Sequence, residues 1–537
     1  MAVSCLVYRL APKIPLCPLT PTSSTPTSPN NAPPSLPLPL PPLSPHPPLR
    51  LPLPLPLRLL HPLLRRRHRP LVRRHPHPAP CRRYFARFPP FQNSSSDLYH
   101  SFLHLTLGLA DRAQSHLRRL GSRCQSDAER TAWLDCWRLY TNAALQLNRT
   151  LSRACSPLDS QTWLSAALTN LHTCRHGFAE LGASPALIRP VIQYNLSDLI
   201  SNLLAVNNAT PATPATPGWM MTLSHQRRLL QLASSRPDLV VAQDGSGNFR
   251  TIKDALNAAA TAKQSGRRGS GTFVIYVKAG AYSENLNVIS GLSNLTLIGD
   301  GIGRTVITGV FADGFMATGI TFRNTFGPGS QAVALLSASD RSVFYRCSFE
   351  GYQDTLCVFS QRQFYRECDV YGTIDFIFGN AAAVFQNCNI FVRRPRAGES
   401  NVITAQGRSD PNQNTGIVVQ SSAIRAAPEF VPVERAVRSY LGRPWMQYSR
   451  TIFVRSYIDS IIDPAGWLPF NGNFALSTLY YAEFGNTGPG SRLSGRVRWP
   501  GYHLIARASA IKEFSVGRFI AGRTWIPSTG VPFSSGF

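Results

Sequence analysis

The feature that most constrains the fold is a repeat of about 21 residues in the C-terminal half of the chain. Aromatic, cysteine and aliphatic residues return there 20 or 21 positions apart, between turns rich in Gly, Asn and Asp. A fixed period of this size is typical of a solenoid, and the β-rich content favours strands over helices. The sequence therefore predicts a right-handed parallel β-helix over residues 237–537, with inward-facing ladders of equivalent residues. The repeated residues are Phe344, Phe364 and Phe385, then Cys347, Cys368 and Cys388, then Phe349, Val370 and Ile390.

The cysteine ladder allows two interpretations, either stacked small core residues or a disulfide that involves one of the three. One short helix, Ile252 to Ala262, is expected before the repeats begin. The strands that follow would make this region mainly β.

Residues 95–205 show helical periodicity instead and predict a small all-α antiparallel bundle. Trp133, Trp137 and Tyr140 recur on one helical face, and Asp127 is placed to cap that helix. Cys136 and Cys174 lie on separate expected helices, and a disulfide between them would tie the two together.

Two low-complexity segments surround this bundle. Residues 1–92 repeat Leu-Pro and then Arg, with 13 Lys/Arg and no Asp/Glu up to position 90, and predict a disordered or polyproline-like tail. Residues 206–236 form an expected linker of Ala-Thr-Pro repeats. Its basic pair, Arg227 and Arg228, reads equally well as a protease site or as a solvated basic turn.

The charge of the chain suits a polyanionic partner. The formal net charge is +27, which fits nucleic acid, a membrane surface or an acidic polysaccharide and does not choose among them. No apolar run reaches transmembrane length. Prolines and Arg9 interrupt the N-terminal apolar stretch, so a signal peptide is not evident, whereas five Asn-x-Ser/Thr sequons weakly favour a secreted glycoprotein.

The repeat also places candidate catalytic residues side by side. Asp354 and Asp375 are 21 residues apart, and Gln331 and Gln353 are 22 apart, so each pair should occupy adjacent coils about 4.8 Å apart. Two neighbouring carboxyl groups cannot both ionise at low cost, and their pKa values should separate. One can then attack as an anion while the other donates a proton.

The amides and one arginine complete this chemistry. Gln353 and Gln331 are placed to bind a developing oxyanion, and Arg443 in Leu-Gly-Arg-Pro-Trp is a candidate to hold the anionic aspartate. The alternative is that these Asp and Gln residues only cap coils and turns.

At these motifs the chain resembles the plant pectin methylesterases, and the resemblance covers essentially all of residues 237–537. The helical region resembles the inhibitor-like pro-region that precedes many of these enzymes, through Ala132-Trp-Leu-Asp-Cys136 and Cys174. The matching stretches of the C-terminal region are Gly280–Glu284, Gln331–Leu335, Gly351–Leu356, Gly372–Asn380, Leu441–Trp445, Gly466–Pro469, Thr487–Gly490 and Trp499–Gly501.

The resemblance implies a role for each site residue. Asp375 matches the nucleophile that attacks a galacturonate methyl ester, and Asp354 matches the acid/base that protonates methanol and then activates water. Gln353 matches the oxyanion donor, Gln331 the residue that assists it, and Arg443 the residue that positions the nucleophile. Hydrolysis of pectin to pectate and methanol is the implied activity.

The resemblance has further implications for binding, processing and location. Trp445 matches an aromatic residue that packs on sugar, with a groove-lining core role as the alternative, and no metal or organic cofactor is implied. The implied partners are pectin and the intramolecular pro-region, without nucleic acid or a transmembrane segment, in a monomer. Arg227 and Arg228 match the processing motif, after which the enzyme would be exported to the cell wall.

Three departures from the family pattern generate the alternatives. No counterpart follows Ile307-Thr-Gly309 for a strand, a turn and a substrate-contacting Thr; the pro-region lacks its first cysteine pair; and the tail replaces a signal or anchor. A catalytically impaired inhibitor or wall-binding homologue is therefore one alternative. Another pectin-acting β-helix enzyme is a second, although a lyase would need a calcium-binding acidic cluster and a hydrolase would need carboxylates across a glycosidic bond.

Overall fold

The computed structural model describes residues 76–77, 79, 95–152, 155–208, 237–265, 271–286, 292–308 and 314–537. Nearly all of the expected tail and of the expected linker, with Arg227 and Arg228, lies outside these residues. The departure after Gly309 falls there too. No helix in the described ranges is long and apolar enough to cross a bilayer.

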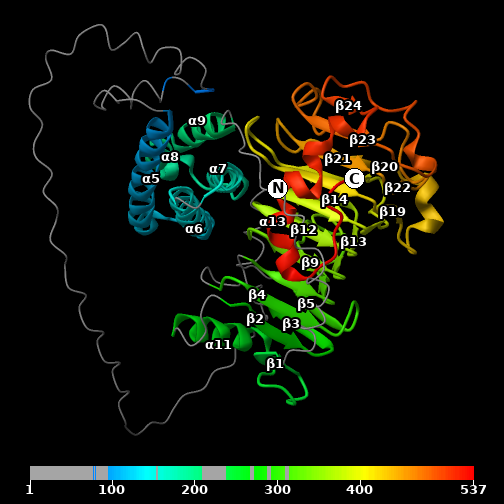
Figure 1. The fold of residues 1–537 in the computed structure, drawn as a ribbon, viewed down its shortest axis with the longest axis horizontal. Helices are drawn as coiled ribbons and strands as arrows, with labels where there is room; N and C mark the ends of the chain where they lie inside the picture. Colours follow the sequence, from blue (N-terminus) through cyan, green and yellow to red (C-terminus); the bar gives the residue numbers. More distant parts are fainter. Residues whose placement is uncertain are drawn as a thin grey trace, which may run out of the picture.

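The C-terminal region is a parallel β-helix built from three sheets, which run from β1 to β24 along its axis (Figure 1). The largest sheet contains, in spatial order, β1 (Leu239–Val241), β2 (Phe273–Val277), β4 (Leu295–Gly299), β6 (Met316–Thr318), β9 (Ser342–Tyr345), β12 (Arg362–Arg366), β15 (Ala382–Gln386), β18 (Gly416–Gln420), β21 (Arg450–Val454), β23 (Tyr480–Phe484) and β24 (Tyr502–Leu504). The second contains β22 (Tyr457–Ile458), β19 (Ala423–Ala426), β16 (Asn389–Val392), β13 (Asp369–Gly372), β10 (Ser348–Glu350), β7 (Thr321–Arg323), β5 (Thr305–Thr308) and β3 (Gly280–Asn285). The third contains β20 (Ser439–Gly442), β17 (Asn401–Gln406), β14 (Ile374–Gly379), β11 (Leu356–Val358) and β8 (Leu335–Ser337).

The strand register confirms two of the predicted ladders. Ser348 pairs with Asp369 and Asp369 with Asn389, which stacks the preceding cysteines Cys347, Cys368 and Cys388. All three are buried free thiols, so the interpretation as stacked core residues is the correct one. Phe349, Val370 and Ile390 are direct partners in the same ladder.

The predicted aromatic ladder was wrong at one of its three positions. Phe344 pairs with Tyr365, not with Phe364, and Tyr365 pairs with Phe385. These three rings stack inside the coil, with centroids 4.9 and 4.3 Å apart. Because strand side chains alternate between faces, a shift of one residue sends Phe364 to the outer face, where it packs against Phe533.

Short helices cover the outside of the solenoid. α11 (Ile252–Gln264) begins at the expected residue and buries Ile252, Ala255 and Ala259 against the first coils. Near the C-terminus, α12 (Val516–Phe519) and α13 (Gly522–Trp525) lie over the outer face of the largest sheet, in one apolar cluster with Phe364.

The N-terminal region is helical, as its periodicity indicates. Ser126, not Asp127, caps the second long helix, because its side chain accepts the backbone N–H of Glu129. The expected disulfide between Cys136 and Cys174 is present and joins the second and third long helices. The helices are α5 (Ser95–Leu120), α6 (Asp127–Thr150), α7 (Pro157–Glu180), α8 (Pro185–Ile192) and α9 (Leu196–Asn208).

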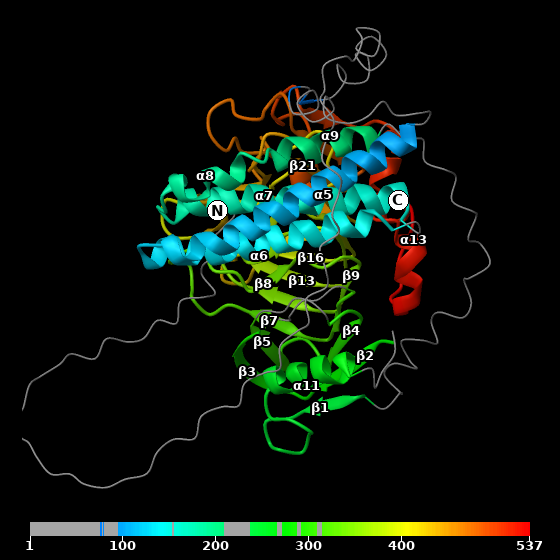
Figure 2. The ribbon, with the colours of Figure 1, turned by 90° about the vertical axis from the view of Figure 1, so that its left-hand side faces the viewer.

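Helix α7 is buried on both sides. Its apolar residues Leu164, Leu168 and Leu171 join the core of the bundle, while Thr162 and Thr169 on the opposite side are also buried. The polar side faces the solenoid. In Figure 2 the long helices run across the upper half of the solenoid, and α7 is the one that lies against it in Figure 1.

The β-helix has a hydrophobic core of its own. The main buried cluster extends from Val241 to Tyr481 and contains no residue of α5 to α9. Removal of the helical region would therefore expose a surface and leave this core intact, so the solenoid has what it needs to fold alone.

A substitution at Gly379 tests how closely the backbones of adjacent coils approach each other. Its φ is +126°, and a Cβ there would lie 2.1 Å from the backbone oxygen of Val358 on the preceding coil. We expect Gly379→Ala to lower the free energy of unfolding by about 2–4 kcal/mol, because a backbone atom cannot move aside cheaply. Urea unfolding of the β-helix measures this.

Gly398→Ala is the matched control. Gly398 also has a positive φ, +82°, but nothing lies within 4 Å of the added methyl group. Only the conformational cost of about 1 kcal/mol is then expected. Equal losses in the two variants would contradict the close approach of adjacent coils.

Candidate active site

The structure brings Asp354 and Asp375 together on adjacent coils. Leu356 of β11 pairs with Ile377 of β14, and the backbone N–H of Asp354 donates to the oxygen of Ile374 at 3.0 Å. The step between paired residues is 21, so the two aspartates occupy equivalent positions. Both are 1% exposed.

Both aspartates have left-handed backbone conformations. Asp354 has φ +61° and Asp375 has φ +50°. This region costs a non-glycine residue roughly 1–2 kcal/mol and is retained where the surrounding structure holds it, most often at functional sites. Both residues therefore depend on the surrounding coils to hold them in this conformation.

Asp375 is held by Arg443 through two hydrogen bonds. Nε of Arg443 donates to Oδ1 at 2.8 Å and Nη2 donates to Oδ2 at 2.6 Å. Burial raises the pKa of Asp375, and the guanidinium opposes that rise. Arg443 itself lies over the ring of Phe470, with its central carbon 4.8 Å from the centroid. The arrangement favours the anionic form of this carboxyl.

Asp354 has the opposite surroundings. Neither carboxyl oxygen has a hydrogen-bond partner within the described part of the chain. Burial raises its pKa well above the ordinary value, and the facing charge of Asp375 raises it further, with a smaller contribution from Glu180 at the end of α7. Burial and the facing Asp375 therefore favour the protonated form of Asp354, whereas Arg443 opposes the rise in pKa at Asp375.

The other candidates lie on the same coils. The backbone N–H of Ala332 donates to the oxygen of Gln353 at 3.1 Å, so the segments of Gln331 and Gln353 are neighbours. Both side chains are partly exposed. Trp445 packs edge-on against Phe378, with centroids 6.1 Å apart. The predicted processing pair, Arg227 and Arg228, lies outside the described residues.

Helix α7 covers the same coils. A pocket there is lined from the solenoid by Cys357, Phe359, Gly379 and Trp445 among others, and from the helix by Thr169, His172, Thr173 and His176. Two contacts hold the helix over it. Asn380 Nδ2 donates to Thr169 Oγ1 at 2.9 Å, and His172 Nδ1 lies 2.7 Å from Ser409 Oγ.

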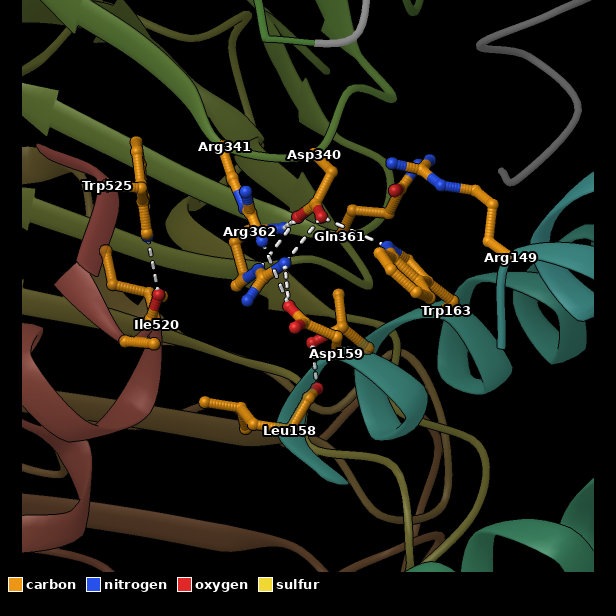
Figure 3. Close-up of polar contacts among 12 residues, drawn as sticks. Arg149, Leu158, Asp159, Trp163, Asp340, Arg341, Gln361, Arg362, Ile520 and Trp525 are labelled. Carbon is orange, nitrogen blue, oxygen red and sulfur yellow. Dashed lines mark hydrogen bonds and ion pairs between the residues drawn. The ribbon is translucent and has the colours of Figure 1, made fainter. Parts of the chain in front are cut away.

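An ion-pair cluster fixes the start of α7 to the solenoid (Figure 3). Arg362, 1% exposed, contacts Asp340 through Nε at 2.9 Å and through Nη2 at 2.6 Å. The same Nη2 lies 2.7 Å from Asp159 of α7, and Arg341 donates to that carboxyl at 3.2 Å. Trp163 Nε1 donates to Asp340 Oδ2 at 3.1 Å.

These arginines set the charge states of the cluster. Burial alone would raise the pKa of both carboxyls, but Arg362 and Arg341 together with weaker contributors outweigh it, lowering the pKa of Asp159 and holding that of Asp340 at about 2. Both carboxylates remain charged until the pH falls below the ordinary carboxyl range. The contact is therefore intact at mildly acidic and neutral pH.

We did not predict from the sequence that the polar face of α7 packs against the solenoid. The signal is a stripe of small polar residues on α7, spaced three or four apart opposite its leucines, which indicates a second buried face. A polar helix face usually meets solvent, and periodicity alone does not distinguish the two cases. The stripe consists of Thr162, Ser165, Thr169 and Thr173, with the partly buried Asp159 at its start.

Comparisons with known proteins agree with this architecture. The Pectinesterase family model matches residues 238–523, and the model for Plant invertase/pectin methylesterase inhibitor matches residues 73–206. The chain is 51% identical to "Probable pectinesterase/pectinesterase inhibitor 17" of Arabidopsis thaliana and 49% identical to "Pectinesterase 2" of Citrus sinensis. Each alignment covers 86% of this chain and 93% of the relative.

Among solved structures, the chain resembles the pectin methylesterase from carrot with a TM-score of 0.54 and 46% sequence identity. The match covers 56% of this chain and 98% of the carrot chain. Taken with the paired carboxyls and the docked inhibitor-like helices, these matches show that the chain belongs to the pectinesterase family.

Proposed function

We propose that this pectinesterase removes methyl esters from pectin with Asp375 as nucleophile and Asp354 as acid/base. The observation that carries the proposal is the unequal pair of buried carboxyls, one bound twice by Arg443 and one without a partner in the described residues. The activity is that of a carboxylic ester hydrolase, and the alternative of an impaired, wall-binding homologue is not favoured.

The first half-reaction forms an acyl-enzyme. A carboxylate oxygen of Asp375 attacks the carbonyl carbon of the galacturonate methyl ester, and the oxyanion accepts a hydrogen bond from the Gln353 side chain, assisted by Gln331. Collapse of this intermediate breaks the bond to the methoxy oxygen. Asp354 donates its proton to that oxygen, and methanol leaves.

The second half-reaction restores the enzyme. Asp354, now a carboxylate, takes a proton from water, and the resulting hydroxide attacks the anhydride formed with Asp375. The bond to Asp375 breaks, the pectin carboxyl is released, and Asp354 again holds a proton. Trp445 would pack against a sugar ring beside the reacting unit, in the pocket that α7 now lines.

The family relationship also suggests how the enzyme is regulated. We infer that the docked helical region restrains the enzyme by covering the coils of the carboxyl pair, and that cleavage near Arg227 and Arg228 separates the two regions. Since pectin is a wall polysaccharide, the β-helix would act in the cell wall after export.

Replacing either carboxyl tests the assigned roles. In the β-helix fragment 237–537, Asp375→Asn should reduce methanol release from esterified pectin at least about 1000-fold, because the nucleophile is lost. Asp354→Asn should reduce it about 100-fold or more, because methoxide must leave without a proton donor. Methanol quantification and circular dichroism together measure activity and fold.

Asp369→Asn is the control, since Asp369 lies on the same coil as Asp375 but on another sheet, bonded to Asn389. It should retain wild-type activity. Full activity in Asp375→Asn would remove Asp375 from the mechanism.

The pH profile tests the charge assignment. Asp375 acts in its ionised form, so activity rises as the pH increases through the pKa of Asp375. Asp354 acts in its protonated form, so activity falls as the pH increases through the pKa of Asp354. Arg443 lowers both pKa values. Arg443→Gln should therefore move both limbs to higher pH and reduce kcat/KM about 100-fold.

Arg438→Gln is the matched control on the neighbouring surface, because Arg438 is 76% exposed. Its profile should be unchanged. If the acid limb of the pH profile lies at the same pH in Arg443→Gln as in the unaltered fragment, the assignment of Asp375 as the anionic partner would be contradicted.

The ion-pair cluster tests the inferred restraint. In the full chain, Asp159→Asn removes the charge that Arg362 and Arg341 share with α7 and leaves Asp340 in place. Loss of this contact should weaken docking by about 1–2 kcal/mol and increase methanol release about 5- to 30-fold. Sensitivity of the helical region to protease should increase in parallel.

Asp127→Asn is matched to it, since Asp127 lies exposed in the first turn of α6. Its rate should equal that of the parent chain. A full chain as active as the β-helix fragment would show that docking imposes no restraint.

A further inference from the structure

Arg393 connects the two coils that carry the paired carboxyls. It follows β16, and its backbone N–H donates to the oxygen of Gly372 at 2.8 Å, at the end of the strand before Asp375. Its side chain extends one coil further. Nη1 donates to the oxygen of Gly351 at 3.0 Å and Nη2 donates to the hydroxyl of Tyr352 at 2.9 Å.

The guanidinium also covers the ring of Tyr352, with its central carbon 3.9 Å from the centroid. Nε is paired with Glu429 at 2.6 Å, and the Arg393 side chain is 22% exposed. A planar fork is needed to meet a carbonyl, a hydroxyl, a ring face and a carboxylate at once, which a lysine ammonium cannot do. The contacts end two residues before Asp354.

The segment held in this way carries the strained turn. Tyr352 accepts the backbone N–H of Thr373 at 3.0 Å, and Thr355 Oγ1 donates to the oxygen of Tyr371 at 2.9 Å. These bonds join the two turns, but neither involves the carboxyl group of Asp354. The positive φ of Asp354 must be maintained by its surroundings, and its carboxyl oxygens have no bonded partner in the described chain to fix their direction.

We propose that Arg393 is a positioning residue, which clamps Gly351 and Tyr352 onto the coil of Asp375 and thereby fixes Asp354 opposite the nucleophile. The inference rests on the proposed function, because it assumes that Asp354 is the acid/base. Arg393 acts through the turn and does not touch the reacting ester. Loosening the turn by about 1 Å is enough to reduce a rate about 100-fold when proton transfer depends on alignment.

Loss of the clamp also admits water to Asp354. Its pKa is raised chiefly by burial and then by the facing Asp375, while Arg443 lowers it and Glu180 of α7 raises it slightly. Hydration would return this pKa toward its ordinary value. The pH at which Asp354 loses its proton would therefore decrease, whereas Asp375, held by Arg443, would keep its own.

The test is Arg393→Met in the β-helix fragment 237–537. We expect kcat for methanol release to decrease about 10- to 100-fold, KM to change less than threefold, and the alkaline limb of the kcat profile to move to lower pH. Arg393→Lys should show most of the decrease in kcat that is expected for Arg393→Met. Tyr352→Phe removes one hydrogen-bond acceptor of Arg393. It should show a smaller decrease in kcat and a shift of the alkaline limb in the same direction. Combined with Arg393→Met, it should change kcat little further.

Arg396→Met is the control, because Arg396 lies on the same segment, exposed, and pairs only with Glu399 among the described contacts. It should behave as the unaltered fragment. An Arg393→Met variant with unchanged kcat and unchanged alkaline limb would overturn the proposal. So would a lower unfolding midpoint without a shift of that limb, which would indicate a structural clamp only.

Two outcomes separate this proposal from the one on which it rests. If the unaltered fragment releases no methanol, or if Asp375→Asn is fully active, the proposed function fails first. If Arg393→Met does not fold, Tyr352→Phe decides alone, and an unchanged alkaline limb in that variant overturns the clamp.

Discussion

The site depends on the parallel hydrogen-bond ladder between β11 and β14. This ladder fixes a step of one coil, and one coil brings Asp354 opposite Asp375. A solenoid imposes the same spacing at every rung, so most rungs carry apolar residues that stack as the core. Asp354 and Asp375 occupy such a pair of equivalent positions. The same stacking of coils that brings the rings of Phe344 and Tyr365 together in the core therefore places two carboxyl groups in one environment.

Arg443 breaks the symmetry that the repeat creates. Equivalent positions on adjacent coils have nearly the same burial, and two identical carboxyls would compete for one proton. A bidentate contact to Asp375 alone gives one acid a bound cation, while the other is buried with no hydrogen-bond partner among the described residues. The asymmetry therefore comes from a residue two strands further along the same sheet, since Arg443 follows β20 and is 68 residues along the chain from Asp375.

The helical region uses the repeat in another way. α7 presents a polar face to turns that succeed one another along the solenoid, from Asp340 and Arg362 at its start to Ser409 further along. Because the contacts are polar and the solenoid keeps its own core, docking can be reversed without unfolding either part. An ion pair at the first turn of α7 anchors the helix away from the reacting groups.

The sequence by itself determined the β-helix, the bundle, the bridge between Cys136 and Cys174, and the stacking of Asp354 on Asp375, because each depends on a period or on neighbouring residues. It failed at Phe364, where a step of 20 was read as a ladder although the register runs through Tyr365. It was silent on Asp159 with Arg362, and on Arg393 with Tyr352, because such contacts join distant segments whose approach no period encodes. Only the tertiary structure gave the two acids their unequal surroundings, since burial and the bidentate contact of Arg443 are properties of the folded chain.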